Sequence, residues 1–232
     1  MATTRAKRDI DWEVNALPPL DIALSRAWQA NVTNFSNPPT SDLNRLGLIA
    51  IHNEDSAEGS IVTNVAVNGQ NAIPLVTSFN QSGGTTGFSN EFALYYLTEA
   101  QLNIIGTNPA ITVTFSGTPD VFTIGTAIYA NVNQASPTSG INEFNGVNIT
   151  GANSLAATAE DGGVSIYVSG GGSPVTSVTV TSYIEVADIS NLGGDAFIFE
   201  KLPSVSPTET ASATITGTFN RYVSFIANLR RA

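Results

Sequence analysis

The stretch AITVTFSG (110–117) and the run VFTIGTAIYANVN (121–133) that follows it decide the fold class. In the first, apolar and polar residues alternate with a period of two, which is typical of a half-buried strand. The second is apolar almost throughout and rich in β-branched residues, which indicates a strand in the centre of a sheet. Gly125 within it predicts a kink or bulge. The two segments therefore predict two strands of a β domain.

Similar segments recur outward from this pair at intervals of roughly 8–14 residues, separated by glycine-rich turns, which is the spacing of an antiparallel sandwich or barrel. The segments are LGLIAIH (46–52), SIVTNVAVNG (60–69), AIPLVTSF (72–79), EFALYYL (91–97), VNITG (147–151), SLAATAE (154–160), GVSIYVSG (163–170), SVTVTSYIEVAD (177–188), DAFIFEKL (195–202), ASATITGTF (211–219) and RYVSFIANL (221–229). The sequence predicts an all-β fold, an antiparallel β-sandwich of jelly-roll type with an extended N-terminal arm.

Three local patterns refine this expectation. The turn dipeptide Asn68-Gly69 predicts a hairpin over residues 60–79. Thr98 and Gln101 have capping-box spacing, which predicts a short helical turn over 98–105. The Ser-, Gly- and Asn-rich stretch ASPTSGINEFNG (135–146) is expected to be a long loop.

Residues 1–45 differ in composition from the rest of the chain. They contain both tryptophans, Trp12 and Trp28, together with two Pro-Pro pairs and little alternation. The segment from Leu20 to Ala30 fits a short helix or an extended strand. Such an apolar segment is expected to pack on its own body or on a neighbouring copy. The sequence thus divides into an arm (1–45) and a β-sandwich domain (46–232).

Charge is segregated along the chain of 232 residues, whose net charge is −10. Residues 46–200 contain thirteen acidic residues and no Lys or Arg. A body of this charge repels nucleic-acid phosphates and anionic lipid, so neither is an expected partner. Basic residues lie toward both ends and act either as simple solubilising charges or as docking groups for the acidic body of a neighbouring copy. The docking hypothesis assigns an interface to Arg5, Lys7, Arg8, Trp12, Trp28, Arg221, Arg230 and Arg231.

The N-terminus, MATTRAKRDIDW (1–12), has no apolar stretch of the kind found in a secretory signal peptide. No run of ~18 apolar residues is present, so membrane insertion is not expected. A location in a virion or at the extracellular or cell surface, reached without a classical signal peptide, is the expectation.

Few residues for catalysis are available. The chain has no cysteine, which excludes thiol chemistry and disulfides. Its one histidine, His52, ends a predicted strand and is expected at the surface, and no serine-hydrolase elbow accompanies it. Carboxylate pairs for glycoside hydrolysis could be drawn from Glu91, Glu99, Glu143 and Glu185. Thirteen acidic residues make some such pair almost inevitable by chance, so the sequence favours a protein that is not an enzyme.

Two binding hypotheses remain open. Asp188, Asn191 and Asp195 share one glycine-containing loop and supply the oxygen ligands that calcium prefers, so a structural calcium ion is the one cofactor considered. The alternative is an ordinary solvated turn. Tyr95, Tyr96, Phe144 and Tyr167 form either a sugar-binding face or part of the core.

Three segments give the chain a family resemblance. They are AIYANVNQASP (127–137), SYIEVAD (182–188) with the aromatic strand DAFIFEK (195–201) after it, and the final strand RYVSFIANLRR (221–231). In these the chain resembles bacterial and phage β-sandwich proteins with jelly-roll-like folds. The resemblance implies a structural role at a surface or in a virion and no defined activity.

Three functions follow as hypotheses. The first is a structural, self-associating subunit of a virion, such as a head-decoration or tail protein, or of an extracellular surface or filament assembly. Its partners are other copies of itself, or other virion or surface proteins, with the arm docking on a neighbouring subunit. The alternative is a carbohydrate-binding β-sandwich module, and the third is an enzyme of glycosidase type.

Overall fold

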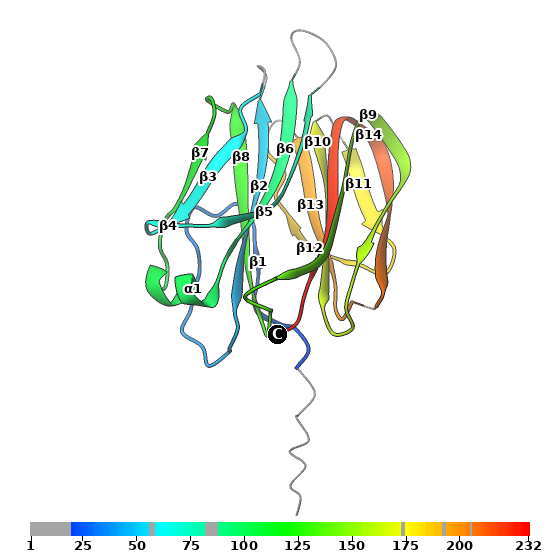
Figure 1. The fold of residues 1–232 in the computed structure, drawn as a ribbon. Coiled ribbons are helices and arrows are strands. Elements are labelled where there is room, and N and C mark those ends of the chain that lie inside the picture. Colours follow the sequence, from blue (N-terminus) through cyan, green and yellow to red (C-terminus); the bar gives the residue numbers. More distant parts are fainter. Residues whose placement is uncertain (1–19, 56–58, 82–87, 173–174, 192–193, 205) are drawn as a thin grey trace, which may run out of the picture.

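A computed structural model describes residues 20–55, 59–81, 88–172, 175–191, 194–204 and 206–232 (Figure 1). The first half of the chain builds a five-stranded antiparallel sheet and a small three-stranded one. The larger has the order β1 (Ala23–Gln29), β8 (Val121–Ala130), β2 (Leu46–Asp55), β6 (Ser89–Leu97) and β5 (Ile73–Gln81). The smaller contains β4 (Gln70–Asn71), β3 (Val62–Val67) and β7 (Ile111–Phe115), and the helix α1 (Glu99–Ile105) lies beside it.

The second half builds a six-stranded sheet. Its main path is β11 (Val175–Val180), β14 (Thr208–Leu229), β10 (Val164–Gly172), β13 (Gly194–Lys201) and β12 (Ile184–Asp188), and β9 (Thr138–Thr158) pairs with β14 along its length. The β9–β14 ribbon doubles back on itself: the side chain of Asn142 donates to the carbonyl of Ala156 on the same strand. The register shifts once in the bend, between Ile215 and Phe219.

Three hydrophobic cores separate the layers. The central core lies between the two large sheets and includes Leu48, Phe92, Val168 and Phe225. A second lies between the five-stranded sheet and the small sheet, with Phe35, Ile51, Val65 and Leu102. A third fills the space under the folded-back ribbon, with Tyr167, Val178, Leu155 and Tyr222. Because β2 touches two cores, it is buried along its whole length, which explains why its sequence is apolar instead of alternating.

The predicted all-β sandwich is confirmed. Its jelly-roll type is not confirmed, because each large sheet is built from its own half of the chain. The capping box of Thr98 and Gln101 is confirmed. The hairpin over 60–79 is only partly correct: β3 pairs with β4 around Asn68-Gly69, whereas β5 pairs with β6.

One local expectation is wrong, and the bulge expected at Gly125 is absent from the pairing with β2, although the β1–β8 pairing shifts register between Arg26 and Gln29. Residues 138–146, expected in a loop, belong to β9, because β14 offers a backbone partner along the stretch and outweighs its turn-forming composition. Gly125 makes no bulge with β2, since the β2–β8 register is unbroken. It is small because a Cβ atom there would come within 3.1 Å of Ile189.

Candidate functional site

The outer edge of β9 is the most conspicuous exposed feature. Within the described residues, β9 pairs with β14 on one side and with no strand on the other. All five residues from 141 to 145 are exposed. Ile141, Phe144 and Val147 are large apolar side chains at this edge, with exposed fractions of 39%, 38% and 48%. A strand edge that has no strand partner and carries exposed apolar side chains is a template for pairing with another chain.

The sequence encodes the bend that brings this edge to the surface. Asn148 and Gly151 on β9, and Gly217 on the opposing part of β14, have positive φ angles of 54°, 75° and 107°. Asn and Gly tolerate this left-handed region better than other residues. On either side of the bend the register is regular, and eight consecutive pairs join residues 140–147 to residues 221–228.

The other edges of the two large sheets are interrupted. The β1 pairing has two register shifts, and the β5 pairing has one next to Pro74. In the six-stranded sheet, the β11 pairing has one shift, and β12 is five residues long with one shift. Bulges, prolines and short edges are devices that discourage pairing between molecules. The regular edge of residues 140–147 has none of them, and Glu143 is its one charged residue.

No protein-family model, no curated protein and no solved structure matches this chain. Its function must therefore be argued from its own geometry.

Trp28, predicted to dock on a neighbour, is instead buried in its own chain. β1 pairs with β8, and the Trp28 Nε1 donates to the Tyr129 hydroxyl at 2.9 Å. That hydroxyl donates to Glu200 Oε2 at 2.6 Å. This buried chain of hydrogen bonds links β1 and β8 of the five-stranded sheet to β13 of the six-stranded sheet, which explains why the indole packs within its own chain. Arg5, Lys7, Arg8 and Trp12 lie outside the described residues.

The C-terminal arginines have partners within the chain, and their docking on a neighbour stays a prediction. Arg221 pairs with Glu54, Arg230 with Glu160 at 2.9 Å, and Arg231 with Asp21 at 3.4 Å. The physical reason is proximity: the last strand lies beside acidic residues of its own body.

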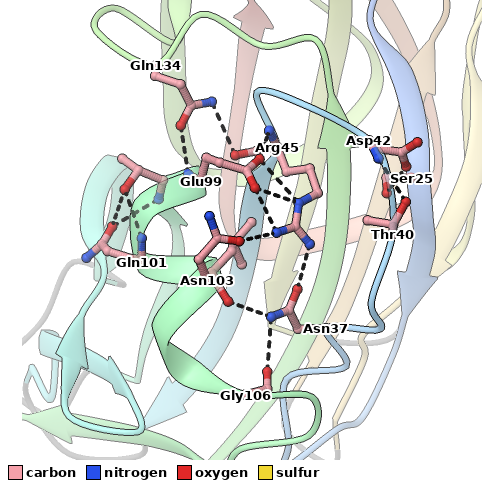
Figure 2. A network of polar contacts seen from close by, with 12 residues as sticks. Ser25, Asn37, Thr40, Asp42, Arg45, Glu99, Gln101, Asn103, Gly106 and Gln134 are labelled. Carbon is pink, nitrogen blue, oxygen red and sulfur yellow. Dashed lines mark hydrogen bonds and ion pairs between the residues drawn. The ribbon is translucent and has the colours of Figure 1, made fainter.

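A further ion pair fixes the segment that follows β1 (Figure 2). The Arg45 guanidinium donates to Glu99 at the start of α1, and also to Asn37 and Asn103. Although burial pushes the pKa of Glu99 upward, the hydrogen bonds and charge of Arg45 outweigh it and hold that pKa below its usual value. Residues 37–45 are thereby fastened to α1.

Two of the three candidate calcium ligands, Asp188 and Asn191, are engaged in local hydrogen bonds. Asp188 Oδ1 accepts from the Ser190 backbone N–H, and Asn191 Oδ1 accepts from the Gly194 N–H. The Asn191 amide is turned inward, 3.2 Å from the His52 ring. Across the described part of the chain, no three His, Asp or Glu side chains gather closely enough to hold a metal ion. The calcium site stays a prediction.

His52, expected at the surface, is fully buried. It lies between the two large sheets in a set of polar side chains, named here the His52 cluster: His52, Glu54, Asn90, Asn191 and Arg221. The Asn90 amide donates to His52 Nε2 at 2.8 Å, and the backbone of Ile189 accepts from the ring. Burial lowers the pKa of His52 to about 4, so the ring is neutral at pH 7.

The opposite face of the same sheet holds the Glu91 cluster, made of Asn53, Asp55, Ser60 and Glu91. Glu91 Oε2 accepts from the Val62 N–H at 2.9 Å, whereas Oε1 has no partner among the described protein atoms. Burial raises the pKa of Glu91 to about 7. No sequence motif marks these clusters, because strand alternation alone puts His52 and Glu54 on one face and Asn53 and Asp55 on the other.

Both clusters are buried and engaged in local hydrogen bonds. His52 contacts amides and a backbone carbonyl, and Glu91 is 1% exposed. The four carboxylates considered for glycoside hydrolysis lie on four separate elements, which are β6, α1, β9 and β12. The aromatic residues considered for sugar binding do not form a row, since Tyr95 and Tyr167 are buried in different cores.

A separate groove runs beside β7 and β8. Its apolar part encloses about 330 Å³ and is lined by Val32, Ile111, Val113, Phe122 and Ile124, with Asn31, Thr33 and Thr123 at its polar positions. A polar hollow shares Asn31, Val32 and Thr33 with it and adds Gln29, Asn34, Ser36 and Asn108. None of these lining residues is charged.

The part of the chain that the structure describes contains no helix long and apolar enough to cross a membrane.

Proposed function

We propose that this protein is a structural subunit that associates with copies of itself, in a virion as a head-decoration or tail component or in an extracellular surface or filament assembly. The observation that carries the proposal is the regular and almost uncharged edge that residues 140–147 of β9 form. Edge pairing supplies backbone hydrogen bonds, and exposed apolar side chains add burial.

The charge of the body predicts how salt acts on this association. Each copy carries a net charge of −10, so copies repel one another at low ionic strength. Arg221, Arg230 and Arg231 are neutralised within the chain and do not offset this repulsion between copies. Added salt screens the repulsion, and association through an apolar edge therefore strengthens with salt. If a basic arm docked on an acidic neighbour, the association would instead weaken as salt is added.

The test is the particle mass of the purified chain, measured by sedimentation velocity at low and high salt and followed by negative-stain microscopy. A variant lacking residues 1–19 is compared with the full chain. The deletion stops at residue 19 because β1 and Phe35 belong to the folded body. Oligomers that grow with salt in both forms support the proposal. A monomer in both forms at high concentration and high salt contradicts it.

The uncharged groove favours one second function, a carbohydrate-binding module. Its amide side chains suit sugar hydroxyls, and Phe122, 41% exposed, offers a ring on which a sugar could stack. Titration with neutral oligosaccharides, monitored by isothermal calorimetry, tests this alternative. Heat that disappears in Phe122→Ala would support it, and no heat at millimolar ligand would reject it.

A further inference from the structure

We infer that two copies pair edge to edge through β9, antiparallel, about a two-fold axis that passes through Phe144. The inference rests on the proposed function and specifies its contact. In an antiparallel pair related by a two-fold axis normal to the sheet, one residue lies opposite its own copy. Residues at equal distances before and after it then lie opposite each other.

The exposed apolar residues of β9 have this symmetry. Ile141 lies three positions before Phe144, and Val147 lies three positions after it. An axis through Phe144 therefore places Phe144 opposite the partner's Phe144, and Ile141 opposite the partner's Val147. Directly opposed aromatic or aliphatic pairs are the contacts that stabilise antiparallel strands. All three side chains, exposed in the single chain, become covered at once.

The polar residues agree with the same register. Glu143 lies opposite the partner's Asn145, so the carboxylate faces an uncharged amide. Asn142 lies opposite the partner's Gly146, which leaves room for the longer side chain. The remaining side chains thus meet without a pair of like charges.

Registers with the axis through a nearby residue give less favourable cross-strand pairs. An axis through Glu143 would place two carboxylates directly opposite each other, which is destabilising. An axis through Asn142 or Asn145 would place Phe144 opposite a glycine of the partner. The Phe144 register is the one that pairs every apolar side chain of the edge with another.

The edge is also held in place before pairing. The Asn80 amide on β5 donates to the Gly146 carbonyl at 2.6 Å, and the eight-residue pairing with β14 supports the strand from its other side. A preorganised edge loses little conformational entropy on association. In the resulting dimer, the six-stranded sheets of the two copies form one continuous sheet.

Because the chain has no cysteine, disulfide cross-linking can test the register directly. Phe144→Cys places two thiols opposite each other across the axis, within the Cα separation of about 4.5–5.5 Å that a disulfide accepts. Ile141→Cys is the matched control, since it lies on the same strand with a similar exposed fraction. Its thiol would be six residues, or about 20 Å along the strand, from its copy. An equimolar mixture of Ile141→Cys and Val147→Cys should form a mixed disulfide.

Mild oxidation followed by a non-reducing gel should therefore show a covalent dimer with Phe144→Cys and with the mixture, and monomer with Ile141→Cys or Val147→Cys alone. Circular dichroism checks that each variant is folded. If sedimentation shows oligomers but the Phe144→Cys chain cross-links no better than Ile141→Cys, the register is wrong and self-association stands. If oligomers also vanish on removal of residues 1–19, a neighbour's N-terminal segment is the occupant. A monomer throughout overturns both proposals.

Discussion

The His52 cluster and the Glu91 cluster lie on opposite faces of the same end of the five-stranded sheet, and they hold buried charge in different ways. On the face toward the second large sheet, the Glu54 carboxylate pairs with Arg221, and the neutral His52 ring accepts from Asn90. On the face toward the small sheet, Glu91 accepts hydrogen bonds, and no cation among the described residues pairs with it. One face is thus electrically compensated, and the other depends on taking up a proton.

The surroundings of the two clusters explain the difference. Arg221 lies on β14 and reaches Glu54 across the central core, with its guanidinium 4.9 Å from the centre of the Phe88 ring. On the other side, Glu91 receives a backbone N–H from Val62 of the small sheet and an amide N–H from Asn53 on the neighbouring strand β2. Neither donor carries a charge that could replace the hydration lost by the carboxylate.

The largest effect is expected from breaking the compensated face. Arg221→Met should lower the free energy of unfolding by about 3–5 kcal/mol, because it leaves the Glu54 carboxylate buried without its cation. The double variant Glu54→Gln/Arg221→Met should recover a substantial part of the loss. Arg230→Ala is the control, since its exposed pair with Glu160 should be worth less than about 1 kcal/mol. Urea unfolding measures all three, and equal losses for the two arginines would contradict the compensation described here.

The next effect is acid lability from His52. Its folded pKa of about 4 lies below the usual value of 6.5, so the unfolded chain binds the proton more tightly. The contribution of His52 is complete above pH 6.5 and is lost as the pH falls toward 4, by about 3 kcal/mol at the limit. His52→Gln removes this slope from urea unfolding curves measured between pH 4 and 8. An unchanged slope in that variant would show that the ring is not held neutral by burial.

Glu91 should act in the opposite direction. Its folded pKa of about 7 lies above the ordinary 4.5, so stability is highest below pH 4.5 and falls as the pH rises through 7. Glu91→Gln should stabilise the protein at pH 8 by about 2 kcal/mol, less than the full linkage term of about 3, because the new amide must also find a partner. Between pH 4.5 and 6.5 the His52 and Glu91 slopes oppose each other, so each single variant should reveal the slope of the other residue. A Glu91→Gln profile that parallels the natural one at all pH values would contradict this account.

The sequence predicted the strands well because alternation and turn residues are local signals, as in AITVTFSG and in the capping box of Thr98. It failed where a partner distant in sequence decides the outcome. The composition of residues 138–146 is typical of a loop, but the pairing with β14 makes them a strand. Trp28 is predicted to dock on a neighbour, but its indole N–H donates a hydrogen bond to the Tyr129 hydroxyl of the same chain. His52 is buried, contrary to the expected surface position, because Asn90, Asn191 and the second sheet cover it. These partners are distant in sequence, so the residues next to His52 give no signal of its burial.

The smallest effect compares how tightly the two faces are packed. A Cβ at Gly194 would lie 2.5 Å from the Gly171 carbonyl oxygen and 2.8 Å from Glu54 Oε2, against the compensated pair and a rigid backbone. A Cβ at Gly117, beside the Glu91 cluster, would meet only Ser60, whose hydroxyl is 2.8 Å away and can rotate. Gly194→Ala should therefore cost about 1–3 kcal/mol. Gly117→Ala should change stability by less than about 0.5 kcal/mol, because lower entropy of the unfolded chain offsets the adjustment of Ser60. Thermal unfolding of the two variants side by side decides the matter, and a larger loss for Gly117→Ala would mean that the Glu91 face is the rigid one.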